Sequence, residues 1–138
     1  MSRRTVDARR PFRRVNVSSG FPIDRAPGVA PGRSSGSAYG NLIWAVATSD
    51  DKTLDLDGQI AAAFAKIERV LGHFNTDKRY LVSANIFLSN LDNKKEFDVA
   101  WKGWVGDNPE HWPQRACIGA TLSPGTLVEI SVVAARPS

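Results

Sequence analysis

Cysteine and histidine are scarce in this sequence, and their scarcity removes several classes of site. The 138 residues include one cysteine, Cys117, and two histidines, His73 and His111. A single cysteine excludes an intramolecular disulfide and any metal site built from several thiolates, and a reducing cytoplasm is then the default compartment. The histidines lie far apart in the chain, without cysteine or paired carboxylates at ligand spacing, so we predict no metal site.

Long apolar runs are also absent. No run approaches the roughly 20 residues that a membrane-spanning helix needs, and the basic start of the chain lacks the apolar core of a secretory signal. The sequence contains no P-loop, GxGxxG, GxSxG or HExxH motif, so none of the functions tied to those motifs is indicated. We therefore expect no membrane partner, and an apolar fraction of 42% is sufficient for the core of one globular domain.

The positive charge is concentrated at the start of the chain. The formal net charge is +4, yet residues 1–14 hold six arginines and one acid, a net +5, which leaves −1 for the rest. A basic tail can contact nucleic acid or anionic lipid, but it is more often a solvated chain end. The nearly neutral body argues against nucleic acid as a partner, because phosphate binding depends on clustered cations.

The apolar periodicity predicts one α+β domain. Residues 1–36, rich in Arg, Pro, Gly and Ser, are expected to form a basic N-terminal segment that is a loop, and residues 37–138 to form the domain. The pattern predicts a strand at residues 41–49, a helix at 54–74, a strand at 81–90 and a helix at 91–107. Two further strands are predicted within residues 113–135, joined by a turn at 123–125. Both helices can cover one face of a single sheet, and the uncovered face, with its scattered apolar groups, predicts self-association.

Four polar side chains on the last two strands are candidates for a site. Side chains alternate along a strand, so Arg115 shares a face with Cys117, and Glu129 shares one with Ser131. If the two strands pair through the turn at 124–125, one polar face holds all four residues. The alternative is a solvated strand face on which an Arg–Glu pair contributes little stability. No base for Cys117 is identifiable, which favours a buried structural thiol over a nucleophile.

Four segments, together spanning about residues 39–135, resemble one known family. They read "GNLIWAVA" on the first strand, "DLDGQIAAAFAKI" on the first helix, "FLSNLDNKKEFDVAW" from the second strand into the second helix, and "PQRACIGATLSPGTLVEI" near the end. The last segment is the most specific, because its arginine, turn proline and glutamate occur in the family's order. On these motifs the chain is identified as a divergent member of the RidA/YjgF family, the reactive-intermediate enamine/imine deaminases.

The resemblance implies a fold, an assembly and a chemistry. The family fold is a chorismate-mutase-like α+β unit that forms a homotrimer with clefts between subunits. By position, Arg115 would bind the substrate carboxylate through two parallel hydrogen bonds, Glu129 would orient water or transfer a proton, and the backbone at Cys117 would help to hold the substrate. The implied reaction is hydrolysis of a small carboxylate-bearing enamine or imine with release of ammonia, which needs positioning and proton transfer but no cofactor.

The sequence departs from the family pattern around this implied pocket. "GRSSG" occupies the place of a Pro-Tyr-Ser segment, so Arg33 stands near the tyrosine position and Ser34 near the serine. Asp98 replaces a helix asparagine, and Gly119 replaces a glutamate. Arg33 is therefore a candidate for a second anion contact, which favours a dicarboxylate or another acidic ligand; the alternative is an ordinary loop arginine. Trp112, in a Pro-containing loop, is a further candidate for lining the pocket.

Three functions stay open on the sequence. The first is a trimeric deaminase or hydrolase of the cytoplasm that acts on a small carboxylated imine or enamine. The second is a family member that binds a small carboxylate and does no chemistry. The third is endoribonuclease-like RNA binding, since some relatives are described as ribonucleases, and here only the arginine-rich tail supports it.

Overall fold

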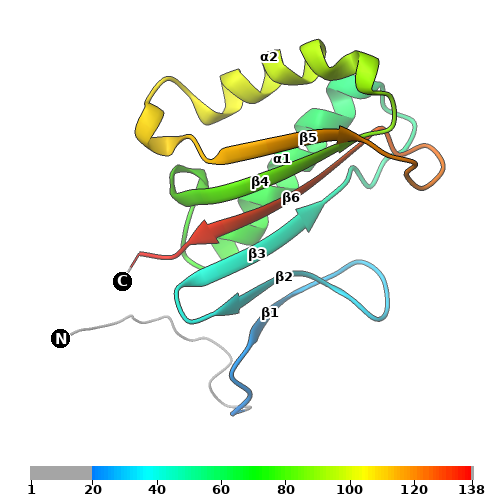
Figure 1. The fold of residues 1–138 in the computed structure, drawn as a ribbon. Helices are drawn as coiled ribbons and strands as arrows, with labels where there is room; N and C mark the ends of the chain where they lie inside the picture. Colours follow the sequence, from blue (N-terminus) through cyan, green and yellow to red (C-terminus); the bar gives the residue numbers. More distant parts are fainter. Residues whose placement is uncertain (1–19, 138) are drawn as a thin grey trace.

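One mixed β-sheet organises the protein, whose structure is a computed structural model that describes residues 20–137. Six strands lie in the order β1-β2-β3-β6-β4-β5 (Figure 1). Their bounds are β1 Asp24–Pro27, β2 Ser34–Tyr39, β3 Leu42–Ala47, β4 Leu81–Leu88, β5 Gln114–Gly119 and β6 Val128–Ala135. The helices are α1 Leu56–His73 and α2 Lys94–Val105, with short 3-10 turns at Lys78–Tyr80, Leu91–Asn93 and Pro109–His111.

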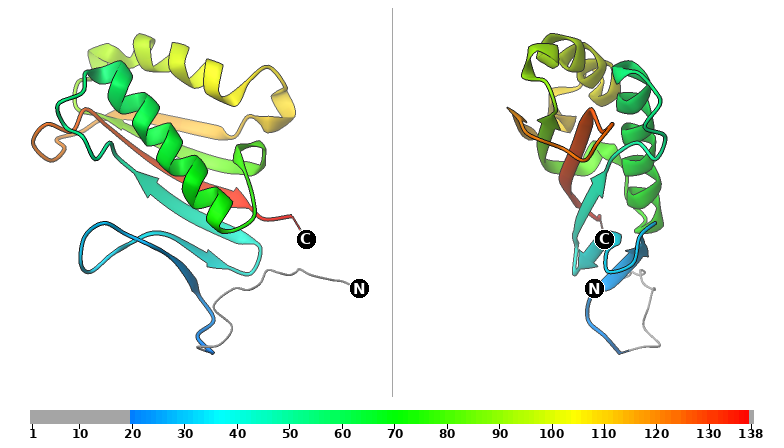
Figure 2. Two further views of the ribbon diagram at one scale, coloured as in Figure 1. Left: turned by 180° about the vertical axis from the view of Figure 1, so that it is seen from behind. Right: turned by 90° about the vertical axis from the view of Figure 1, so that its right-hand side faces the viewer.

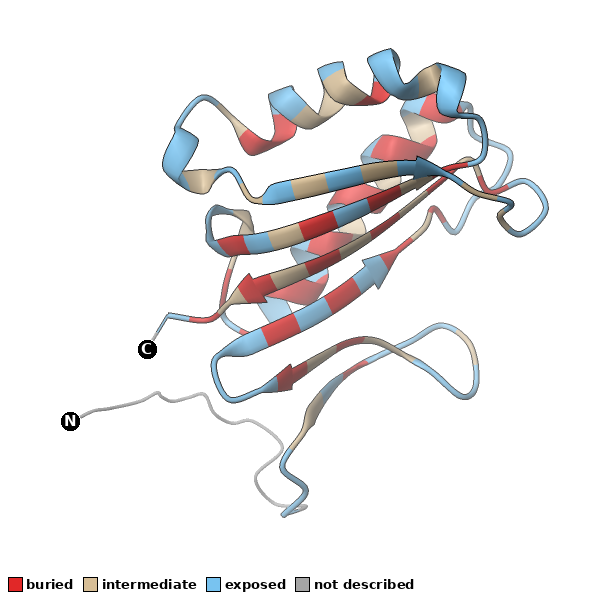
Figure 3. Cartoon of the chain, viewed as in Figure 1, coloured by how far each residue is buried: buried red, intermediate tan, exposed pale blue. Residues whose placement is uncertain are grey.

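Both helices lie on one side of the sheet. Seen from behind, α1 runs across the sheet and α2 lies near the β5 edge, while the opposite face is uncovered (Figure 2). Along β3 and β6 buried residues alternate with more exposed ones (Figure 3), as expected for strands with one face on a core. The predicted α+β class, with two helices packed on one face of a single sheet, is confirmed.

Helix α1 supplies much of the core because its apolar residues recur every three or four positions. Ile60, Ile67 and Leu71 are buried against the sheet. The carboxylate of Asp55 caps the helix by accepting a hydrogen bond from the Gly58 amide at 2.9 Å. A buried polar residue, Gln59, interrupts this apolar stripe, and its contacts organise a neighbouring loop described below.

The last two strands do not form a hairpin, so that part of the sequence prediction is wrong. Strand β4 lies between them: β5 pairs with β4 in parallel, and β6 pairs with β4 and β3 antiparallel. The turn at Pro124–Gly125 does form, but the segment that contains it connects two strands that are not neighbours. The α2 segment provides the long connection that a parallel β4–β5 pair requires.

The sheet begins earlier in the chain than the sequence predicted. Residues 24–27 belong to strand β1 and residues 34–36 to strand β2. The prediction that residues 1–36 form a loop is therefore wrong for these two segments. Gly28 permits the tight approach of these strands, since a Cβ there would lie 2.4 Å from the backbone oxygen of Arg33. The arginine-rich residues 1–14, and the tail functions predicted for them, lie outside the described residues.

The uncovered face of the sheet is partly apolar. Leu42, Trp44 and Val46 of β3 and Ile118 of β5 project there, and each is 40–50% exposed. Exposed apolar side chains on an uncovered sheet face are typical of a surface that another protein surface covers, and self-association stays a prediction. Within residues 20–137 no helix is long and apolar enough to cross a membrane.

Candidate functional site

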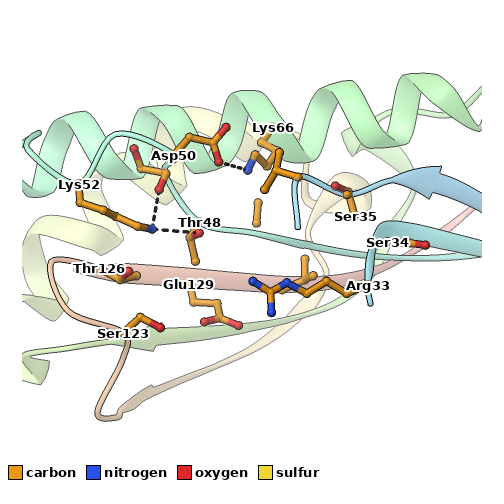
Figure 4. Close-up of a pocket in the computed structure, with 15 residues that line it drawn as sticks. Arg33, Ser34, Ser35, Thr48, Asp50, Lys52, Lys66, Ser123, Thr126 and Glu129 are labelled. Carbon is orange, nitrogen blue, oxygen red and sulfur yellow. Dashed lines mark hydrogen bonds and ion pairs between the residues drawn. The ribbon is translucent and has the colours of Figure 1, made fainter. Parts of the chain in front are cut away.

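One cavity, with a volume of about 510 Å³, gathers three of the candidate residues. This size suits a small-molecule ligand. The cavity opens where β2 separates from β3, because the pairing of these strands ends at Gly36–Ala45. Its wall contains Gly28, Val29, Arg33, Ser34, Ser35, Val46, Ala47, Thr48, Ser49, Asp50, Lys52, Lys66, Ser123, Thr126 and Glu129 (Figure 4). Arg33, Ser34 and Glu129, all singled out in the sequence, therefore share one space.

Glu129 reaches the cavity because strand alternation turns it away from the core. Its neighbours Val128 and Ile130 are fully buried on the helix side of β6, while Glu129 is half-buried on the other side. Figure 4 shows the Arg33 side chain extended toward the Glu129 carboxylate. Among residues 20–137, no ion pair within 4 Å involves Glu129, so its carboxylate oxygens are available to a ligand or to water.

The loop after β3 contributes the other charged groups. Lys66 of α1 donates to Asp50 at 2.6 Å, and this hydrogen bond lowers the pKa of Asp50 below its ordinary value. The Lys52 ammonium donates to the Thr48 hydroxyl at 3.2 Å and to the Ser49 carbonyl at 2.6 Å. Asp50 is thus already matched by a cation, while Lys52 is held only by neutral oxygens.

Arg115 and Cys117 lie on the other side of the sheet. They pair in register with Ala84 and Ile86, which are buried beneath the helices, whereas Glu129 pairs with Phe87 on the opposite face. The prediction of one polar face holding Arg115, Cys117, Glu129 and Ser131 is therefore wrong. Neither Arg115 nor Cys117 lines the cavity.

The Arg115 guanidinium is enclosed by residues of α2. It donates to Asp98 at 2.6 Å, and it lies 5.5 and 5.4 Å from the ring centroids of Phe97 and Trp101. Only 16% of its side chain is exposed. Burial by itself raises the pKa of Asp98, but hydrogen bonds from Lys94 and Arg115 outweigh it and hold that pKa below its ordinary value. Asp98 therefore offsets the charge of Arg115 within the subunit.

Two further candidate residues lie away from the cavity. Burial raises the pKa of the Cys117 thiol, which disfavours the thiolate at neutral pH and agrees with a structural role. The indole of Trp112 donates to the Gly106 carbonyl at 2.9 Å, and its side chain is largely exposed outside the cavity wall. The described residues hold no group of three or more His, Cys, Asp or Glu side chains that could bind a metal ion.

Sequence reasoning missed the contributions of two loops to the cavity. Thr48 and Lys52 follow β3, and Ser123 and Thr126 precede β6. The only signal was a cluster of hydroxyl and charged residues directly after a buried strand, which is also typical of an ordinary turn. Their convergence depends on sheet order, which places the end of β3 beside the start of β6.

Gln59 holds one of these loops in place. Its side chain is fully buried, its amide nitrogen donates to the carbonyls of Gly125 at 2.9 Å and Leu54 at 3.1 Å, and its oxygen accepts from the Leu127 amide at 2.9 Å. The two contacts to Gly125 and Leu127 enclose Thr126 of the cavity wall. Gln59 thus positions the wall without entering the cavity.

Comparisons with known proteins agree with the fold and with the sequence motifs. A family model described as Endoribonuclease L-PSP matches residues 43–136. A RutC family protein of Haemophilus ducreyi is 35% identical over 86 residues, which cover 62% of this chain and 72% of that protein. A solved structure from Salmonella typhimurium is 32% identical, with a TM-score of 0.72 over 82% of this chain and 96% of the other. A YjgF-family structure from Neisseria meningitidis is 26% identical, with a TM-score of 0.73 over 84% and 96%.

The fold and the polar cavity define a small α+β protein with one sheet, two helices on one face and an open polar site. The chain belongs to the RidA/YjgF family, as its motifs predicted. Membership of this family supports a role in small-molecule processing in general.

Proposed function

We propose that the protein is a cofactor-free hydrolase that deaminates a small carboxylate-bearing enamine or imine. The observation that carries this proposal is the placement of Glu129, a carboxylate without an ion-pair partner among residues 20–137, in a polar cavity of small-molecule size. A half-buried carboxylate beside a bound substrate is a suitable general base. Family membership supports the same class of chemistry.

Hydrolysis of the imine needs one water and the transfer of two protons to the nitrogen. The enamine first tautomerises to the imine, and water then adds to the carbon of the C=N bond. Glu129 accepts a proton from the attacking water and transfers it to the nitrogen, which gives the carbinolamine. It then removes the hydroxyl proton of the carbinolamine and transfers that proton to the nitrogen as the carbinolamine collapses. The C–N bond breaks, ammonia leaves, and a 2-oxo acid remains, so that one water is consumed for each ammonia released.

The carboxylate anchor proposed for this reaction is Arg115, and its position requires a second subunit. Arg115 and Glu129 project from opposite faces of one sheet, so a single subunit does not present both to one substrate. In a homotrimer with clefts between subunits, Arg115 of the partner subunit completes the cavity that contains Glu129. Its bond to Asp98 means that a substrate carboxylate must compete with, or share, this guanidinium.

The test is ammonia release from 2-aminoacrylate, which a dehydratase generates from serine in the assay. The wild type is expected to accelerate release, and Glu129→Gln to lower the rate by about 100-fold or more, because it removes the general base. Arg115→Ala is expected to abolish activity while the oligomer stays intact on size-exclusion chromatography. Glu110→Gln, on an exposed turn outside the cavity, is the matched control for the loss of a carboxylate.

Mixed oligomers test the shared site directly. If the two inactive variants are co-expressed, a site formed by Arg115 of one subunit and Glu129 of the next is intact in about a quarter of cases in a randomly mixed ring. Recovery of about that share of wild-type activity supports the two-subunit site, and no recovery from a mixed, folded oligomer contradicts it. Saturable carboxylate binding without ammonia release from a panel of imines would instead favour a non-catalytic binding protein.

A further inference from the structure

We infer that this site selects substrates with a second anionic group, which Arg33 and Lys52 bind. The inference rests on the proposed function and specifies its substrate class. It concerns the cavity of this subunit, whereas the first carboxylate is assigned to Arg115 across the subunit boundary. The ligand class is a small dianion, such as a dicarboxylate or a carboxylate that also has a phosphate group.

The charges that line the cavity support this inference. Three cations and two acids line it, but Lys66 and Asp50 neutralise each other at 2.6 Å. The remaining charged groups are Arg33, Lys52 and Glu129, with a net charge of +1. The described residues contain no ion pair of Arg33 or Lys52 within 4 Å, so both cations are available to an anionic ligand.

The hydrogen-bonding groups of the wall point to the same class of ligand. An ammonium has three donors, and Lys52 uses two of them on Thr48 and Ser49, which fixes the side chain and leaves one donor for a ligand. The hydroxyls of Ser34, Ser123 and Thr126 add neutral donors around the same space. The apolar side chains of the wall are Val29, Val46 and Ala47, so most of the residues that line the cavity are polar or charged.

A ligand with only one anionic group leaves this part of the site poorly matched. If it fills the cavity, it displaces water from Arg33 and Lys52 without replacing the lost hydrogen bonds, which is unfavourable for a charged group. A second carboxylate or phosphate replaces those bonds with charge-assisted ones. Such a hydrogen bond changes affinity by about 10- to 100-fold.

Binding and turnover can be measured separately with defined probes. Calorimetry compares pyruvate, which has one carboxylate, with 2-oxoglutarate, which has two, and with 3-phosphoglycerate, which has one carboxylate and one phosphate. Turnover compares the imino acids that amino acid oxidases generate from alanine and from glutamate. We expect the dianions to bind about 10-fold more tightly or better than pyruvate, and the glutamate-derived imine to be hydrolysed with the higher kcat/KM. The preferred dianion identifies the second group as carboxylate or phosphate.

Two variants and a control locate the second anion site. Lys52→Gln and Arg33→Gln are expected to weaken dianion binding about 10-fold or more and to weaken pyruvate binding by a smaller factor, because pyruvate has no second anionic group. Both side chains are exposed, so the fold should tolerate these changes. Lys95→Gln, on the exposed surface of α2 and outside the cavity wall, controls for the loss of one positive charge.

The outcomes separate this inference from the proposed function. Equal affinity for pyruvate and both dianions, or unchanged dianion binding in the two variants, overturns the inference even if imines are hydrolysed. A dianion preference that depends on Lys52 and Arg33, without turnover of any imine, upholds the second anion site and rejects the deaminase.

Discussion

Gln59 allows a quantitative test of how the cavity wall is held. Replacement by methionine keeps the length of the side chain and removes all three of its hydrogen bonds, to Leu54, Gly125 and Leu127. A net hydrogen bond contributes about 1 kcal/mol. Since Leu54 and Gly125 are themselves exposed, water can replace part of what their carbonyls lose. We therefore expect Gln59→Met to lower the free energy of unfolding by about 2 to 3 kcal/mol.

Urea denaturation at one fixed protein concentration measures this loss, because oligomers unfold in a concentration-dependent way. The same change corresponds to a fall in Tm of about 5 to 10 °C for a domain of this size. The matched control is Gln114→Met, an exposed glutamine of β5, with an expected effect within about 0.5 kcal/mol. If Gln59→Met is no more destabilising than Gln114→Met, the three bonds do not hold the loop. Hydrogen exchange gives a second measurement, since the Leu127 amide should lose protection in Gln59→Met only.

Three further outcomes follow from the same contacts. Because burial raises the pKa of Cys117, iodoacetamide should modify it more slowly at neutral pH than it modifies free cysteine, and an equal rate would contradict its placement. Because the pKa of Asp98 is lowered in the folded protein, the stabilisation by its carboxylate is complete above about pH 5 and is lost as the pH falls below 3.8, the ordinary pKa of an aspartate. Asp98→Asn should therefore make the free energy of unfolding less dependent on pH in the acid range, and an unchanged dependence would refute this. Gly28→Ala should weaken dianion binding about 10-fold or more by displacing Arg33, and calorimetry that shows wild-type affinity would refute this role.

The sequence predicted the elements whose pattern is local. Helix α1 shows a regular apolar spacing and an aspartate cap, and strand β3 is a compact apolar run, so each could be recognised without its neighbours. Strands β1 and β2 could not, because "DRAP" and "SSGSAY" contain small, polar and proline residues that rarely favour strands. Strand β2 pairs with β3, and β1 pairs with β2 at the sheet edge; these tertiary contacts make them strands.

Strand order was the information that periodicity did not contain. Two neighbouring segments joined by a Pro-Gly turn are typical of a hairpin, yet β4 pairs with both β5 and β6 and separates them. The same error hid the cavity, since the loops after β3 and before β6 meet only in the observed order. A prediction of site residues therefore needed the neighbours of each strand as well as its boundaries.

The faces of β5 and β6 show why Arg115 and Glu129 were placed together. Alternation states which residues of one strand share a face, and it leaves open which face that is. For β6 the buried residues Val128 and Ile130 show which face lies against the helices, so Glu129 must face away from them. For β5 hydrophobicity points the wrong way, since Ile118 is exposed while Arg115 faces α2.

Arg115 can occupy that buried side because α2 compensates its charge. Asp98 accepts its hydrogen bond, and the rings of Phe97 and Trp101 lie against the guanidinium, an arrangement that stabilises a partly desolvated cation. This placement determines how the proposed chemistry must be organised. An anchor and a base on opposite faces of one sheet can act on one substrate only when they come from different subunits, so recovery of activity in mixed oligomers tests the fold and the proposed mechanism together.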